Sequence, residues 1–286
     1  MRSTADWRDY ELIDCSDGER LERWGKYILI RPDPQVLWQS AKTNPLWNKA
    51  DARYFRSSTG GGKWEIYKKL PDSWRINYKS LSFNVKPMGF KHTGLFPEQA
   101  VNWDWMRSIV RDAPKPFRVL NLFAYTGGAT CALAKEGAEV VHLDASKGIV
   151  AWAKANAASS GLEEAPVRFI VDDALKFVLR EQRRQRTYHG ILMDPPSYGR
   201  GPNGEMWKIE DDLYSLTREA VKLLDDDARF FLINSYTTGL APSAVENVMR
   251  VALRGRGGRF ETGEVCLPMS GSELVLPCGA SGRWQK

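Results

Sequence analysis

The sequence has few of the residues from which metal sites and disulfide frameworks are built. Its 286 residues include only three histidines and four scattered cysteines (Cys15, Cys131, Cys266 and Cys278), with no CxxC pair. We therefore expect no metal site and no disulfide framework, because both need closely placed ligands or partners. Unpaired thiols are typical of the reducing cytoplasm, which is the location that we expect.

Long apolar runs are also missing. The N-terminal stretch MRSTADWRDY is polar and lacks the apolar segment of a signal peptide. No part of the chain approaches the roughly 20 consecutive apolar residues that a membrane span needs. We therefore expect a soluble protein without a membrane partner.

Acidic residues are outnumbered by basic ones. The chain has 35 Asp and Glu against 41 Lys and Arg, a formal net charge of +6. This favours an anionic partner such as nucleic acid, although a basic enzyme that binds no polyanion has the same charge. Hydrophobic residues make up 43% of the chain, which is enough for a packed core.

The chain changes character near residues 114–117. Before this point it is rich in tryptophan, tyrosine and turn residues. Three segments in it (26–38, 63–70 and 81–88) resemble short strands, of which the first is interrupted by prolines. We expect a small β-rich module over residues 1–95, a candidate for substrate recognition. A second domain follows over residues 96–286, and a helix near residues 100–111 leads into it.

From Arg118 onward, apolar strands alternate with helices. Strands are expected at residues 118–124, 138–144, 167–173, 188–194 and 228–236. Nearly continuous apolar strands separated by helices are typical of a parallel sheet covered on both faces. Two strand-like tail segments, 259–268 and 273–279, close the series. The predicted fold class is therefore α/β, with a Rossmann-like seven-stranded, mostly parallel sheet that ends in an antiparallel strand.

Two common nucleotide-binding motifs are absent from the loop after the first of these strands. The loop FAYTGGAT (Phe123–Thr130) matches neither GxGxxG nor GxxxxGK[ST], which weakens the dinucleotide and P-loop hypotheses. In such sheets, ligands bind at the carboxyl ends of the strands. The loop is therefore either a ligand-binding turn, whose glycines allow close backbone approach, or a tight strand–helix turn without a ligand.

An acid follows each of the next three strands: Asp144, Asp173 and Asp194. A carboxylate at the first position can accept both hydroxyls of a ribose, and one at the second can accept an exocyclic adenine N–H. Each aspartate alone is more often a helix cap. Three acids after three successive strands together outline an adenosine-shaped site.

The stretches NLFAYTGGAT, HLDAS, VDDA and MDPPSYG, in this order and spacing, resemble class I S-adenosylmethionine-dependent methyltransferases. The similarity is closest to the large-subunit ribosomal RNA methyltransferase family with the FxYTGG and DPP motifs. It extends over about residues 93–236, including HTGLFPEQ (His92–Gln99). It does not extend over residues 1–90, where the RNA-binding module of some members has no clear counterpart.

The resemblance implies S-adenosyl-L-methionine as the cofactor and assigns residues to it. The implied cofactor contacts are Phe96, Gln99, Phe123, Tyr125, Thr126, Gly127, Asp144, Ser146, Asp173, Ala174 and Asp194. The implied catalytic group is the loop Asp194, Pro195 and Tyr198. There the aspartate and a prolyl carbonyl accept hydrogen bonds from a target amine. Tyr198 either stacks on a base or packs against the loop.

The cysteine that carbon-5 pyrimidine methylation requires is missing. That chemistry starts with addition of a thiolate to the ring. In the cytosine-5 RNA enzymes that this family resembles, the thiol follows the fifth strand, where this chain has Ser235-Tyr236-Thr237. Cys131 is expected in the core, and Cys266 and Cys278 are expected to be structural. A nitrogen target needs no covalent activation and is the better hypothesis.

Outside the motifs, one loop and two basic clusters are candidate RNA contacts. The loop 199–213 contains Arg200, Trp207 and Lys208 and is either a lid with Trp207 as a stacking surface or a flexible connector. The clusters at 180–186 and 254–259 are either phosphate contacts or solvated faces.

We predict an S-adenosylmethionine-dependent methyltransferase acting on RNA, in particular ribosomal RNA. Three alternatives remain open: a methyltransferase for a protein or small molecule, a non-catalytic cofactor-binding ribosome-assembly factor, and, least compatible with the DPP motif, a nicotinamide dehydrogenase. The sequence leaves the oligomeric state open between monomer and homodimer.

Overall fold

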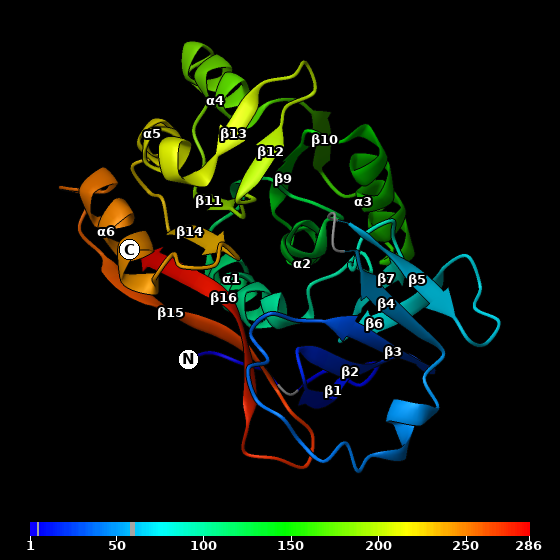
Figure 1. Cartoon of the computed structure of the whole chain (residues 1–286). Coiled ribbons are helices and arrows are strands. Elements are labelled where there is room, and N and C mark those ends of the chain that lie inside the picture. Colours follow the sequence, from blue (N-terminus) through cyan, green and yellow to red (C-terminus); the bar gives the residue numbers. More distant parts are fainter. Residues whose placement is uncertain (5, 58–60) are drawn as a thin grey trace. The chain divides into compact units, whose positions relative to one another are not determined.

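The computed structural model describes residues 1–4, 6–57 and 61–286, and the chain forms two compact units (Figure 1). The first unit comprises residue 1 together with residues 101–265 and 279–286. The second comprises residues 2–100 and 266–278. The assignment of substrate recognition to residues 1–95 concerns function and remains a prediction.

The first unit contains a seven-stranded sheet in the order β10-β9-β8-β11-β14-β16-β15. Its strands are β8 (Arg118–Leu122), β9 (Glu139–Asp144), β10 (Val167–Val171), β11 (Gly190–Met193), β14 (Phe230–Ser235), β15 (Arg259–Pro268) and β16 (Val275–Gln285). Neighbouring strands from β10 to β14 are parallel, and β16 pairs with β14 in the antiparallel direction. The predicted fold class is confirmed.

One helix precedes these strands and five helices connect them. They are α1 (Ala100–Asp112), α2 (Gly128–Lys135), α3 (Lys147–Ser159), α4 (Ala174–Arg183), α5 (Ile209–Val221) and α6 (Pro242–Ala252). Helices α2 and α3 pack together, and α5 packs against both α4 and α6, so the helices form groups that cover the two faces of the sheet (Figure 1). Strand residues such as Ile191, Phe231 and Ile233 are fully buried between these layers. Apolar runs in the strands therefore supply the core, as expected for a parallel sheet.

The second unit contains a five-stranded sheet in the order β1-β2-β3-β4-β5 and a separate hairpin, β6–β7. The strands are β1 (Tyr10–Ser16), β2 (Glu19–Trp24), β3 (Tyr27–Pro32), β4 (Ala52–Arg56), β5 (Gly62–Ile66), β6 (Trp74–Tyr78) and β7 (Leu81–Val85), with short 3-10 helices η1 (Pro45–Asn48) and η2 (Pro97–Gln99). Only β3 and β4 pair in parallel within the five-stranded sheet. Strand β3 ends at Pro32, well before the predicted end at residue 38, because proline lacks the N–H that would extend the ladder.

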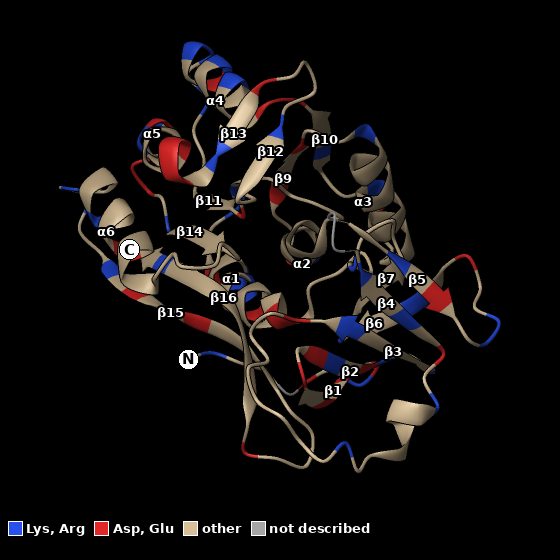
Figure 2. Ribbon diagram, viewed as in Figure 1, with Lys and Arg blue, Asp and Glu red and all other residues tan. Residues whose placement is uncertain are grey.

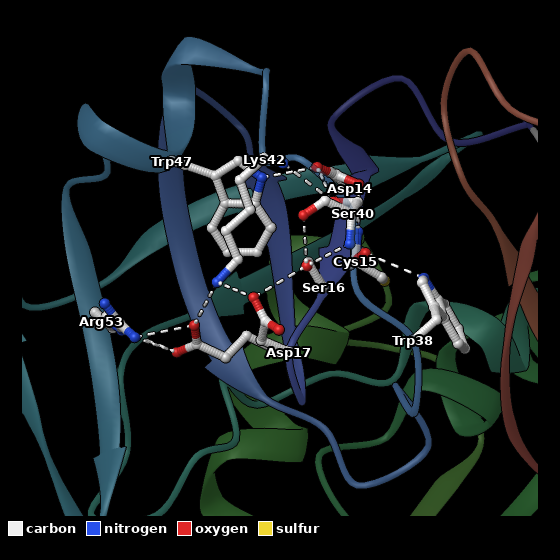
Figure 3. A network of polar contacts seen from close by, with 10 residues as sticks. Asp14, Cys15, Ser16, Asp17, Trp38, Ser40, Lys42, Trp47 and Arg53 are labelled. Atoms are coloured by element: carbon white, nitrogen blue, oxygen red, sulfur yellow. Dashed lines mark hydrogen bonds and ion pairs between the residues drawn. The ribbon is translucent and has the colours of Figure 1, made fainter.

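A polar network attaches the long segment before η1 to this sheet (Figure 3). The Asp14 carboxylate accepts the indole N–H of Trp47 at 2.7 Å. Lys42 lies 3.1 Å from Asp17 and 4.7 Å from the centroid of the Trp47 ring. Arg53 of β4 donates two hydrogen bonds to Glu19 of β2. The segment is thus fixed by side chains where it has little regular backbone structure.

None of the described helices is long and apolar enough to cross a bilayer. No group of three His, Cys, Asp or Glu side chains within the described ranges is arranged to hold a metal ion. All four cysteines are free thiols.

Candidate cofactor and active site

The predicted site residues of the first unit meet at the carboxyl edge of the parallel sheet. The strand register places Leu122 beside both Leu143 and Met193, and places Asp144 beside Val171. The residues that follow these strands therefore begin at the same level of the sheet. This brings together the loops that carry Asp144, Asp173 and Asp194, as the sequence predicts.

The loop after β8 has an unusual backbone. Phe123 and Tyr125 have φ values of 54° and 49°, in the left-handed region that side chains other than glycine rarely adopt. Two hydrogen bonds hold this conformation: Ala124 N–H donates to Leu143 at 3.0 Å, and Tyr125 N–H donates to the Asp144 carboxylate at 3.0 Å. Backbone strain of this kind is concentrated at functional sites.

Asp144 is oriented by the backbone around it. One carboxylate oxygen accepts the Tyr125 N–H, and the other accepts the Ser146 N–H at 2.9 Å. Burial raises the pKa of Asp144, and these backbone N–H groups oppose the rise. Each carboxylate oxygen offers about two acceptor positions, so both retain capacity for a further donor.

The two glycines of the loop are explained by packing inside the unit. Gly127 has a φ of 85° and caps α2. A Cβ on Gly128 would lie 2.5 Å from the ring of Trp103 in α1. A side chain at position 128 therefore does not fit, whether or not a ligand binds. This packing requirement holds for both interpretations of the loop, and close approach of a ligand to the glycines remains a prediction.

The other predicted residues of this edge begin helices. The hydroxyl of Ser146 accepts the Ile149 N–H and caps α3. Asp173 caps α4 by accepting the Lys176 N–H at 2.9 Å, and Ala174 is buried directly after it. Asp173 thus performs the helix-cap role that the sequence offered as an alternative. This bond uses one carboxylate oxygen, so it is compatible with an adenine contact through the other.

The MDPPSYG loop leaves β11 at Met193 and is held by neighbouring segments. Pro195 is buried, Asp194 is half-buried, and the side chain of Tyr198 is 53% exposed. The Ser197 hydroxyl lies 2.7 Å from that of Thr237, which belongs to the segment after β14. The ends of β11 and β14 are therefore linked directly.

The segment after this loop is more regular than the sequence suggests. Within residues 199–213, β12 (Tyr198–Arg200) and β13 (Met206–Lys208) form an antiparallel hairpin and α5 begins at Ile209, so the segment is not an irregular connector. A role as a lid over the substrate remains a prediction. The indole N–H of Trp207 donates to the Pro196 carbonyl at 2.6 Å. Its ring centroid lies 5.1 Å from that of Phe123. Trp207 therefore connects the MDPPSYG loop to the loop after β8.

Two predicted residues belong to the other unit. Phe96 directly precedes η2, and Gln99 is its last residue, in the part of the chain before residue 101. A further predicted residue, Thr126, lies in the first unit, where it is buried in the loop after β8. The assignment of Phe96 and Gln99 to the cofactor remains a prediction.

Buried polar residues that were not singled out from the sequence support this edge. Asn121 donates to the Thr130 hydroxyl at 3.0 Å, and this hydroxyl lies 2.8 Å from Nδ1 of His142. Asn156 of α3 donates to the Thr126 carbonyl at 2.8 Å. A polar residue at an inward position of an apolar strand, such as Asn121 in RVLNL, is the only sequence signal for this network.

The comparisons with known proteins agree with this geometry. A model of the S-adenosylmethionine-dependent methyltransferase family matches residues 36–239. The chain belongs to this methyltransferase family. Its cofactor is S-adenosylmethionine, and the enzyme class predicted from the sequence is confirmed.

Solved structures show how far the similarity extends. The methyltransferase is 37% identical to an S-adenosylmethionine-dependent methyltransferase from Agrobacterium tumefaciens, with a TM-score of 0.94 over 99% of this chain and 92% of that chain. A protein complexed with SAH has the same fold, with 18% identity, a TM-score of 0.74, and coverage of 98% of this chain and 76% of that one.

A curated relative carries a more specific name. The ribosomal RNA large subunit methyltransferase K/L of Shewanella frigidimarina is 33% identical over 155 residues, which are 54% of this chain and 21% of that protein. The chain thus spans about a fifth of the length of the curated relative that it matches.

The residues at the carboxyl edge fit the cofactor chemically. The half-buried Asp144 carboxylate, already held by two N–H groups, has the acceptor capacity that the two hydroxyls of a ribose require. Acids at this edge also suit a cofactor with a cationic sulfonium. The donor set of the methyltransferase is therefore compatible with S-adenosylmethionine.

Proposed function

We propose that this methyltransferase transfers a methyl group to a nitrogen atom of RNA, in particular of large-subunit ribosomal RNA. The observation that carries the proposal is the connection of the MDPPSYG loop to the loop after β8 through Trp207 and Phe123. The name of the Shewanella frigidimarina relative and the net charge of +6 support RNA as the substrate.

The proposed roles follow from the position of each residue. Phe123, Tyr125, Thr126 and Gly127 face the methionine part of the cofactor, Asp144 and Ser146 the ribose, and Asp173 and Ala174 the adenine. Phe96 and Gln99 line the pocket from the preceding segment. Asp194 and the Pro195 carbonyl accept hydrogen bonds from the target amine, and the exposed ring of Tyr198 stacks on the base.

The chemistry is an in-line displacement. When bound, S-adenosylmethionine supplies an electrophilic methyl group on a sulfonium. Asp194 would orient the nitrogen lone pair toward this methyl group, and Asp194 or water would take the proton that the nitrogen loses when its new N–C bond replaces the S–C bond. The enzyme contributes chiefly by aligning the nucleophile and the methyl group.

A nitrogen target is supported by Cys131, the cysteine that lies in the same unit as the MDPPSYG loop. Cys131 is buried in α2, and burial raises the pKa of its thiol to about 12. Burial thus favours the neutral thiol, whereas addition to a pyrimidine ring requires the thiolate.

The test is transfer of labelled methyl groups to total RNA from cells that lack the gene, followed by mass analysis of the modified nucleosides. We expect an N-methylated nucleoside with the wild-type enzyme and at least a 100-fold lower rate with Asp194→Ala. Labelling of protein or small molecules, without labelling of RNA, would contradict the proposal that RNA is the substrate. Cofactor binding without turnover on any pool would overturn the enzymatic proposal in favour of an assembly factor.

A further inference from the structure

The positive charge of the chain is concentrated in one segment of the second unit. Residues 52–92 contain nine Lys and Arg but only two acids, Glu65 and Asp72, for a net charge of +7. The whole chain has a net charge of +6, so all other residues together carry −1. This segment forms β4 to β7, where Figure 2 shows basic residues in blue on the strands.

The strand register sorts the side chains of β4 and β5 onto two faces. Tyr54 points to the buried face and is 4% exposed. On the other face Arg53 lies opposite Glu65, and Phe55 lies opposite Lys63. The ladder continues past β5, because Tyr67 N–H donates to the Asp51 carbonyl at 2.8 Å. The outer face of β4–β5 is therefore formed by Arg53, Phe55, Lys63, Glu65 and Tyr67.

Several cations on or next to this face have no acidic partner. Arg53 is paired with Glu19, and Lys68 lies 3.0 Å from Asp51. Among the described residues, Arg56, Lys63 and Lys69 are exposed and form no ion pair. Lys63 belongs to the outer face, whereas Arg56 ends β4 on the side of Tyr54 and Lys69 follows β5. Together they leave this end of the sheet with unbalanced positive charge, which attracts an anionic partner.

Aromatic rings accompany these cations. The Tyr67 side chain is 52% exposed, and the half-buried Phe55 ring has the Arg53 guanidinium 4.8 Å from its centroid. Exposed aromatic rings on a sheet, flanked by unpaired cations, are the combination with which proteins bind single-stranded nucleic acid: the rings stack on bases and the cations contact phosphates.

We propose that the outer face of β4–β5 binds a single-stranded segment of the RNA substrate. Bases stack on Phe55 and Tyr67, and phosphates lie beside Lys63 on this face and beside Arg56 and Lys69 at its margins. The five residues from Lys63 to Tyr67 extend about 13 Å along the strand, a distance that several nucleotides cover. The proposal rests on the proposed function, because it takes RNA as the substrate, and it gives residues 1–95 their recognition role.

The test measures binding of a fluorescein-labelled, 20-nucleotide single-stranded RNA by anisotropy between 50 and 300 mM KCl. We expect the triple variant Arg56→Gln, Lys63→Gln, Lys69→Gln to bind about tenfold more weakly. The slope of log Kd against log salt should fall by about 2, since each lost phosphate contact removes about 0.7. Tyr67→Ala should weaken binding about tenfold, and Tyr67→Phe should bind like the wild type.

A matched control carries the same change of charge elsewhere. The triple variant Lys154→Gln, Arg168→Gln, Arg229→Gln alters exposed residues of the first unit outside the candidate RNA contacts and should change RNA affinity less than threefold. Calorimetry with S-adenosylmethionine and a thermal melt verify that each variant folds.

Two outcomes would overturn the proposed face. One is wild-type affinity and salt slope in the β4–β5 triple variant. The other is an unchanged affinity of Tyr67→Ala together with equal displacement of RNA by heparin, which would identify a surface for any polyanion. The proposed function fails differently: RNA then binds through the outer face, but no RNA pool accepts methyl groups.

Discussion

At the residue scale, Asp144 combines a structural and a proposed binding role. Its carboxylate accepts N–H groups from Tyr125 and Ser146, so it stabilises the strained loop after β8. The sequence predicts its position, because an acid directly after an apolar strand lies at the carboxyl edge. That Asp144 also holds the left-handed Tyr125 follows only from the structure, since it depends on the pairing of β8 with β9.

The variant Asp144→Asn separates these contributions. An amide nitrogen in place of one oxygen would face a backbone N–H donor, and the negative charge would be lost. We expect the Kd for S-adenosylmethionine to rise at least tenfold, about 1.4 kcal/mol, by calorimetry. As a control, Asp227→Asn replaces an exposed aspartate outside the site and should leave the Kd for S-adenosylmethionine unchanged. An unaltered Kd in the Asp144 variant would remove this residue from the cofactor site.

At the element scale, the hairpin β12–β13 and the start of α2 depended most on tertiary contacts. The sequence GRGPNGEMWK contains glycines that are typical of a loop, yet the Trp207 contacts with Pro196 and Phe123 hold the segment as two paired strands. In α2, the need for glycine at position 128 arises from Trp103, which is 25 residues earlier in the chain. Local patterns contain no information about such distant neighbours.

Replacing Gly128 with alanine tests the packing of α2 against α1. Because the new Cβ would lie 2.5 Å from the Trp103 ring, we expect a loss of about 1–3 kcal/mol in the free energy of unfolding, measured in urea. Gly148→Ala in α3 is the matched control. Nothing lies within 4 Å of a Cβ there, so that variant should be unchanged or up to about 1 kcal/mol more stable. Equal stability of both variants would contradict the packing argument.

At the scale of the whole molecule, the buried His142 and the half-buried His92 connect stability to pH. Burial lowers the pKa of His142 to about 3 and that of His92 to about 4. In the unfolded chain a histidine titrates near pH 6.5. Between these values the unfolded state binds more protons than the folded state, so stability falls as pH falls below about 6.5.

The expected loss is about 1.4 kcal/mol per pH unit for each such histidine. His142→Phe keeps a ring of similar size and removes one titrating group. We expect this variant to be less stable at pH 7, because the contact with Thr130 is lost, but to lose stability less steeply between pH 6.5 and 5. Urea unfolding at several pH values measures both effects. Parallel pH profiles for the variant and the wild type would show that His142 does not titrate on unfolding.

The buried charged residues of the second unit show why sequence patterns did not predict all of its strands. Strands β1 and β2 were not predicted, since ERLERW is rich in charged residues. Glu22 is nevertheless fully buried, because Arg31 donates hydrogen bonds to it at 2.6 and 2.8 Å and the Tyr10 hydroxyl donates at 2.7 Å. A buried carboxylate is tolerated only when such partners surround it, and these come from other strands.

The sequence by itself determined the order of strands and helices in the methyltransferase fold and the edge at which its acids lie, because side-chain periodicity and the ends of parallel strands are local properties. Tertiary structure decided which backbone conformations are held, which glycines are required and which cations remain unpaired. These depend on contacts between residues far apart in the chain. The position of the MDPPSYG loop at the end of a strand illustrates the local properties. The outer face of β4–β5, whose charge balance depends on partners in other strands, illustrates the contacts between distant residues.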